Sequence, residues 1–153
     1  MSYFEFLLFG HLIAAMTWLG GDLMLQMFYL RARVTGPAAV AQFAKDVEWI
    51  GLRVLNTASL LVVIFGVLLV IDSDFYEFSQ FWISAALAMF LLSAVTGAAF
   101  LGPETGRIGA LSDEKGPEAP EVQARIKRVV VISRIELFLL VLIVLDMVLK
   151  PGL

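Results

Sequence analysis

The chain has 153 residues, of which 60% are hydrophobic and only 16% charged, and its formal net charge is −3. Soluble domains are about half apolar and a quarter charged. A domain of this size also has too much surface to leave so few charges on it. The composition therefore excludes disordered, fibrous and nucleic-acid-binding proteins and disfavours a soluble fold. With no cysteine and one histidine, the chain cannot form disulfides, thiolate metal sites or a zinc site with several histidines.

Four apolar segments are long enough to cross a bilayer core of roughly 30 Å, which takes about 20 residues. They cover approximately residues 4–30, 54–71, 81–101 and 129–149. The first lacks a basic leader and is too long for a signal peptide, so we expect it to be retained. The sequence thus predicts an all-α, single-domain integral membrane protein, residues 1–153, folded as a four-helix bundle in a lipid bilayer.

The polar connections suggest where these helices end. Pro103 is expected to stop the third helix, because proline has no amide donor and disfavours a helical residue before it. Residues 104–128 are then expected to form a polar loop, with a flexible turn near 112–121 and the fourth helix starting at about Gln123.

The basic residues predict the orientation of the bundle. Ten of the eleven Lys and Arg lie in or beside the first and third connections, and only Lys150 lies at the other end. Positively charged connections stay in the cytoplasm. We therefore expect a bacterial inner-membrane protein with both termini on the non-cytoplasmic side.

The first connection carries a helical pattern of its own. Its apolar residues approximate helical spacing, and Pro37 suits a first helical position. We expect an amphipathic helix over residues 37–49, at the membrane interface and leading into the second span. An ordinary lead-in helix is favoured over a lipid-sensing or partner-docking role. Trp49 and Trp82 are typical of the aromatic belt of a membrane interface.

Polar residues on the first span share one face. An α-helix rotates by about 100° per residue, so a residue eleven positions further on points within roughly 20° of the same direction. One stripe therefore contains His11, Ala15, Trp18, Asp22 and Gln26. Ionisable residues at membrane depth are expensive and usually functional, so this stripe should face the bundle interior. Beside it, Gly20 and Gly21 permit close helix approach or a bend.

Depth in the membrane groups the remaining polar residues into two clusters. The inner cluster contains Asp22, Gln26, Arg53, Asn56, Arg134 and Glu136. The outer cluster contains His11, Asp146 and Lys150, with Met147 or Met16 nearby.

Each cluster has a structural and a functional interpretation. Asp22 with Arg53 or Arg134 would form a structural ion pair, and Asp146 with Lys150 would pair at the interface. His11 would either hydrogen-bond a neighbouring helix or bind a metal or haem iron. A metal site would combine His11 with Asp146 and Met147, although methionines are more often core fillers.

Three short motifs resemble a known family. The run from His11 through Trp18 to Gly20-Gly21 is similar to the first-helix pattern of small membrane proteins of the DUF2269 type. The stretch from Arg53 to Gly66 and the closing Met147–Pro151 resemble the other motifs of that type. The group is more distantly similar to the CopD copper-resistance domain and to HemJ-type protoporphyrinogen oxidase.

The resemblance implies a four-helix bundle that is often oligomeric. For the HemJ relatives it implies haem b, with His11 as axial ligand and Trp18, Arg53 and Lys150 beside the cofactor. Any enzyme activity would then be that of a porphyrinogen oxidoreductase, and the catalytic residues stay unassigned.

Three functional hypotheses follow. The first is a bundle that binds haem or porphyrin through His11. The second is a metal-ion (copper-type) or small-solute transport or handling protein that uses the carboxylates of Asp22 and Asp146. The third is a structural membrane module. Because four helices bury each other incompletely and a lone histidine would gain a partner across a two-fold axis, we expect a homodimer.

Overall fold

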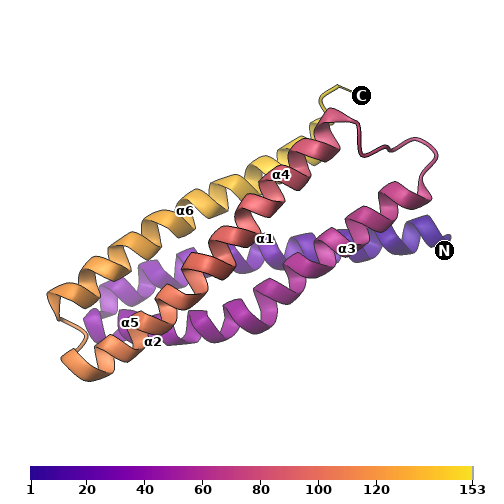
Figure 1. Cartoon of the computed structure of the whole chain (residues 1–153). Helices are drawn as coiled ribbons and strands as arrows, with labels where there is room; N and C mark the ends of the chain where they lie inside the picture. Colours follow the sequence, from indigo (N-terminus) through magenta and orange to yellow (C-terminus); the bar gives the residue numbers. More distant parts are fainter. Residues whose placement is uncertain (153) are drawn as a thin grey trace.

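The computed structural model describes residues 1–152 and is all-helical over that range, with 88% helix. Its elements are α1 (Tyr3–Thr35), α2 (Pro37–Ile50), η1 (Gly51–Leu55), α3 (Asn56–Asp72), α4 (Phe81–Thr96), η2 (Gly97–Leu101), α5 (Gly102–Lys115) and α6 (Pro120–Leu149). The segments η1 and η2 are π-helical and join their neighbours without a break. The chain therefore folds into four long helical rods, with both termini at the same end of the bundle (Figure 1).

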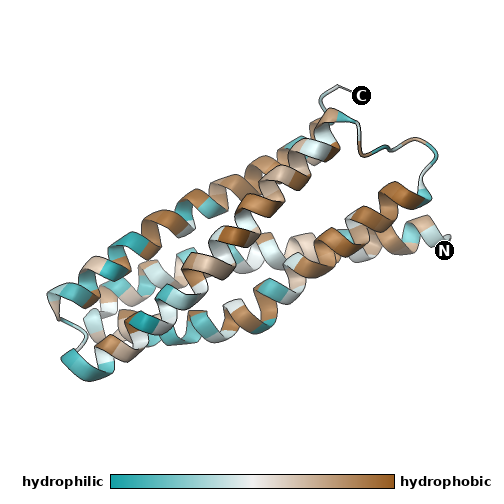
Figure 2. Cartoon of the chain, in the orientation of Figure 1, coloured by the Kyte–Doolittle hydropathy of each residue, from teal (hydrophilic) through white to brown (hydrophobic). Residues whose placement is uncertain are grey.

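Three of the four rods are long and apolar enough to cross a membrane: Tyr3–Thr35, Pro37–Asp72 and Phe81–Lys115. The fourth rod, α6, has 30 residues but carries Arg134, Glu136 and Asp146 in its apolar part. The helical bundle is thus confirmed, while the fourth span stays a prediction. Figure 2 shows hydrophilic residues gathered at the end that holds α2 and α5, opposite the termini.

Local chemistry explains how the first two helices begin. The Ser2 hydroxyl accepts a hydrogen bond from the Glu5 backbone N–H, and the Glu5 carboxylate accepts one from the Ser2 N–H, which makes a capping box. Gly36, at φ 129°, lies in a region that favours glycine and turns the chain into α2. Pro37 then begins α2, as the sequence predicts.

The four rods pack as two pairs. Along the half that holds the termini, α1 packs on α3 and α4 packs on α6, whereas α3 and α4 are not packed together. In the other half, α2 packs on α5 and α1, and α5 packs on α6. A buried core closes that half, made by Tyr29, Val40, Ala44, Ile108, Val122 and Ile126. The amphipathic helix expected at residues 37–49 is confirmed as α2, whose apolar face packs into this core.

The expected end of the third helix at Pro103 is wrong. The helix continues through Pro103 as α5, so most of the predicted polar loop is helical and only residues 116–119 connect α5 to α6. A proline ring normally clashes with the carbonyl four residues earlier. The π-helical turn of η2 ends at Leu101, two residues before Pro103, and widens the helix there, which leaves room for the ring. The prediction that the fourth helix begins before its apolar segment is confirmed, because α6 begins at Pro120.

Candidate functional site

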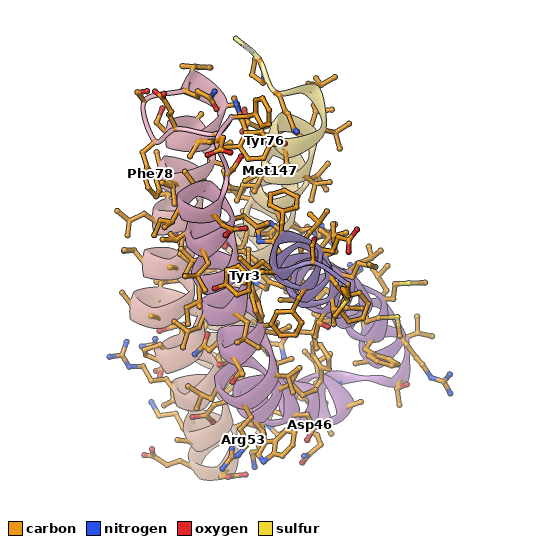
Figure 3. The ribbon with its side chains drawn as sticks, turned by 90° about the vertical axis from the view of Figure 1, so that its right-hand side faces the viewer. Tyr3, Asp46, Arg53, Tyr76, Phe78 and Met147 are labelled. Carbon is orange, nitrogen blue, oxygen red and sulfur yellow. The ribbon has the colours of Figure 1, made fainter. Side chains whose placement is uncertain are left out.

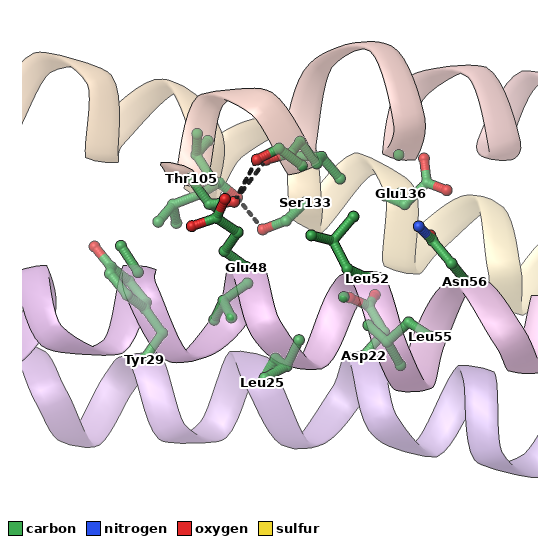
Figure 4. Close-up of a pocket in the computed structure, with 18 of the residues that line it drawn as sticks. Asp22, Leu25, Tyr29, Glu48, Leu52, Leu55, Asn56, Thr105, Ser133 and Glu136 are labelled. Atoms are coloured by element: carbon green, nitrogen blue, oxygen red, sulfur yellow. Dashed lines mark hydrogen bonds between the residues drawn. The ribbon is translucent and has the colours of Figure 1, made fainter. Parts of the chain in front are cut away.

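A cavity of about 390 Å³ lies inside the bundle, within the range of about 300–1,000 Å³ typical of small-molecule sites. Its walls are mostly apolar and come from all four rods (Figure 4). The polar residues that line it are Asp22, Gln26, Glu48, Asn56, Ser59, Ser93, Thr105, Ser133 and Glu136. We call it the carboxylate cavity, after Asp22 and Glu136. Figure 4 shows Asp22 and Asn56 on one side of it and Glu136 on the other.

Asp22 is buried, with 8% of its surface exposed. Its Oδ2 atom has no hydrogen-bond partner among residues 1–152. No ion pair joins it to Arg53 or Arg134 in that range, and neither arginine lines the cavity. Instead, the Arg53 guanidinium lies 5.1 Å from the centre of the Trp49 ring. The structural ion pair expected for Asp22 is therefore not formed in the described part of the chain.

The other polar groups of the cavity are held by neighbours on different helices. The Ser93 hydroxyl on α4 donates to the buried Glu136 carboxylate on α6. The Gln26 side-chain amide on α1 donates to the Ser133 hydroxyl on α6 at 3.0 Å. These two bonds fix the side of the cavity formed by α6, and Asp22 faces the same space without such support.

Both π-helical segments line the carboxylate cavity. Gly51 of η1 and Gly97 of η2 face open space, since a Cβ atom on either would meet nothing beyond its own helix within 4 Å. The Thr105 hydroxyl donates to the carbonyls of Leu101 (3.0 Å) and Gly102 (2.8 Å), where the π turn disturbs the helical ladder. Single π turns inside α-helices occur frequently at functional sites.

His11 lies in the other half of α1 and does not line the cavity. Its Nδ1 donates to the Val62 carbonyl on α3 at 2.9 Å, which confirms the hydrogen bond to a neighbouring helix. Because the carbonyl only accepts, a neutral ring then carries its proton on Nδ1 and its lone pair on Nε2. Gly66 allows this approach, since a Cβ atom there would lie 3.2 Å from His11 Cε1.

Lys150 is held by aromatic residues. Its Nζ donates to the Tyr76 hydroxyl at 2.8 Å and lies 4.8 Å and 5.3 Å from the centres of the Tyr76 and Trp82 rings. The side-chain pair of Lys150 with Asp146 is not formed, although the Lys150 N–H donates to the Asp146 carbonyl. Over residues 1–152, Asp146 Oδ2 and Trp82 Nε1 are buried without partners. Figure 3 shows Tyr76 and Met147 toward the same end, away from Arg53 and Asp46.

The described residues contain no group of three or more His, Cys, Asp or Glu side chains that could hold a metal ion. The predicted set of His11, Asp146 and Met147 has only two residues of those types, so it stays a prediction.

Comparison with known proteins identifies the family. A family model described as a predicted integral membrane protein (DUF2269) matches residues 5–151. The chain belongs to the DUF2269 family. It is accordingly an integral membrane protein. Neither the curated proteins nor the solved structures give a match to this chain. The DUF2269 resemblance is thus confirmed, and likeness to CopD or HemJ proteins is not shown.

Sequence reasoning found only part of the site in this DUF2269 protein. Depth alone placed Asp22, Gln26, Asn56 and Glu136 in one cluster, and all four line the cavity. It missed the other polar lining residues: Glu48, Ser59, Ser93, Thr105 and Ser133. The three serines stand inside apolar segments, where small polar residues mark helix contacts, and that signal was available.

Proposed function

We propose that this DUF2269 protein is a small-solute handling protein that binds a cationic solute in the carboxylate cavity. The observation that carries this proposal is the buried Asp22 carboxylate, which lines the cavity with an unpartnered oxygen. An isolated buried carboxylate is strongly unfavourable, and a cationic ligand would relieve that cost. Glu48 and Glu136 add two further acidic groups to the same cavity.

Other lining residues suit the same class of ligand. The Trp18 ring lines the cavity and packs edge-on against Phe90, with ring centres 5.6 Å apart. An indole ring attracts a cation held over its face. Because the described residues hold no cluster of three ionisable metal ligands, an organic cation is favoured over a copper-type metal ion.

The natural absence of cysteine makes this proposal directly testable. A Ser59→Cys variant in lipid nanodiscs would place a single thiol on the cavity wall. We expect it to react with a trimethylammonium-ethyl methanethiosulfonate at least about tenfold faster than with the anionic sulfonatoethyl reagent, because an acidic, low-dielectric cleft concentrates cations. Adding Asp22→Asn, Glu48→Gln and Glu136→Gln together should remove that preference.

A Leu60→Cys variant is the matched control, since Leu60 is the next residue, is exposed on the surface and does not line the cavity. It should show no preference for the cationic reagent. Equal rates for the two reagents at Ser59→Cys, or a preference that survives loss of all three carboxylates, would refute the proposed function.

A second candidate function is haem or porphyrin binding through His11. The hydrogen bond from Nδ1 to Val62 supports it, because the neutral ring keeps its Nε2 lone pair for a metal. Haem added to purified protein should produce a Soret band that His11→Ala abolishes. Gly66→Ala, which crowds the ring, should shift that band. A preparation that stays colourless after haem is added would rule this function out.

We propose further that the protein lies in the bacterial inner membrane with both termini on the non-cytoplasmic side, and that it forms a homodimer. Ten of the eleven basic residues lie in or beside the first and third connections, and this bias supports the orientation. Incomplete burial of the four rods supports the dimer. Cross-linking in native membranes should yield a discrete species of twice the monomer mass, and a monomer alone would contradict it.

A further inference from the structure

The carboxylate cavity opens at the side of the bundle, between α3 and α4. These two helices pack against α1 and α6 respectively but not closely against each other. Leu52 and Asn56 on one edge and Ala98 on the other line the cavity and are also exposed at the surface. We call these three residues the side opening. In a membrane-embedded bundle, an opening of this kind faces lipid.

Asn56 is an unusual residue to expose at this position. It follows η1 at the start of the apolar helix α3, and an amide facing hydrocarbon without a partner is unfavourable. At the rim of an acidic cavity, the same amide can bind a polar group that moves in from the bilayer. Asn56 therefore gives the side opening a polar rim.

We propose that the ligand is a single-chain cationic amphiphile, such as a protonated alkyl amine, which enters from the bilayer through the side opening. Its ammonium group would lie between Asp22 and Glu136, and its alkyl chain would extend through the opening into lipid. This inference rests on the proposed function and names the class of ligand. Charge complementarity supports the head, since three carboxylates (Asp22, Glu48 and Glu136) and no Lys or Arg are among the lining residues of the cavity.

The shape of the site supports an amphiphile over a freely soluble cation. The cavity walls are mostly apolar, including Leu25, Leu55, Leu101 and Leu140. An ammonium group has three donors and can bond to carboxylate and amide oxygens together. A water-borne ion would gain nothing from the apolar walls, whereas an alkyl chain gains about 0.8 kcal/mol for each buried CH₂.

A membrane-soluble carbodiimide tests the route. Dicyclohexylcarbodiimide dissolves in the bilayer and modifies carboxyl groups, so it should label one of the lining carboxyl groups (Asp22, Glu48 or Glu136) in nanodiscs, as mapped by mass spectrometry. Dodecylammonium should reduce this labelling by about tenfold, the lower end of the enrichment that a charged cleft gives its counter-ion. Dodecanol has the same chain without the charge and should not protect, and methylammonium has the charge without the chain and should protect weakly.

Two neighbouring alanines provide a matched pair of variants. Ala98 and Ala99 are both exposed on η2, but only Ala98 lines the cavity. Ala98→Phe should narrow the side opening and slow carbodiimide labelling, and Ala99→Phe should leave it unchanged. Both variants should keep the same unfolding temperature, which separates obstruction from misfolding.

The outcomes distinguish this inference from the proposed function. Absence of labelling, equal protection by dodecanol, or equal rates in the two phenylalanine variants would overturn entry from the bilayer. If the Ser59→Cys variant still prefers the cationic thiol reagent, the cavity binds a cation that arrives from water, and only the side opening is refuted. If methylammonium protects as well as dodecylammonium, the ligand is a soluble cation and the amphiphile is excluded.

Discussion

Asp22 and Glu104 are both buried acidic residues, but their surroundings are opposite. Asp22 has an unpartnered oxygen, whereas Glu104 accepts hydrogen bonds from Arg107 at 3.3 Å and from Arg125 at 2.5 Å. Glu104 is 3% exposed and links α5 to α6. The same type of charge should therefore lower stability at one position and raise it at the other.

Asp22→Asn should leave the free energy of unfolding unchanged or higher, because it removes a buried charge that no basic residue offsets in residues 1–152. Thermal unfolding in nanodiscs would measure this. A lower unfolding temperature would mean that the carboxylate makes a stabilising contact in the membrane, which would favour the structural interpretation of the cluster.

Glu104→Gln should destabilise the protein by about 1–3 kcal/mol, because two arginines lose their charged partner. Both arginines are partly solvated, which keeps the loss below that of a fully buried pair. Thermal unfolding measures the change, and Glu114→Gln, on an exposed residue of the same helix, is the control. A variant as stable as the parent would show that this link between α5 and α6 contributes nothing.

At the scale of elements, the two π-helical segments distinguish this bundle from four regular helices. Each begins at a glycine, and each lies beside the carboxylate cavity. A π turn holds one more residue than an α turn, so it widens the helix and leaves carbonyls that need other partners. At η2, Thr105 supplies such a partner.

Thr105→Val should therefore cost about 1–3 kcal/mol, because it keeps the side-chain shape but leaves the partly buried carbonyls of Leu101 and Gly102 without that donor. Thr17→Val is the matched control. Thr17 is exposed and donates only to the Ile13 carbonyl within a regular helix, so its loss should change stability by less than about 0.5 kcal/mol. Chemical unfolding of both variants in nanodiscs would measure the difference, and equal losses would contradict the role assigned to Thr105.

The regular parts of these helices explain how far sequence reasoning reached. Rotation by 100° per residue and depth along the axis sufficed to place Asp22, Gln26 and Glu136 in one cavity. Depth alone also grouped Arg53 with these residues, but Arg53 lies in η1, is exposed beside Trp49 and does not line the cavity. Depth along the helix axis also does not determine the direction of a side chain. Long basic side chains can turn outward from the bundle, as the exposed Arg134 does.

The extent of the helices was the least predictable feature. Pro103 signals a helix end in the sequence, and only the preceding π turn, which no residue pattern announces, makes it compatible with a continuous helix. Glu48 was missed for a related reason. Glu48 belongs to α2, which the sequence alone predicts to be an interfacial helix. In the structure, α2 continues through η1 into α3 and forms part of the wall of the cavity.

At the scale of the whole molecule, the orientation combines a structural and a sequence argument. Four rods that alternate in direction bring both termini to one end of the bundle (Figure 1). The four ion pairs of the described residues all lie among α2, α5 and the start of α6, at the opposite end. That end also holds most of the basic residues, so it should remain in the cytoplasm.

Fusions to the C-terminus test this orientation. Alkaline phosphatase, which folds only outside the cytoplasm, should be active there, and a green fluorescent protein should be dark. Replacing Arg31, Arg33 and Lys45 with glutamine should weaken the preference, because the bias of basic residues toward one side sets orientation. Lys150→Gln is the control and should strengthen it, since this residue alone lies at the other end. A fluorescent C-terminal fusion in the parent protein would place the carboxylate cavity in the outer half of the membrane and reverse the side from which a soluble cation would reach it.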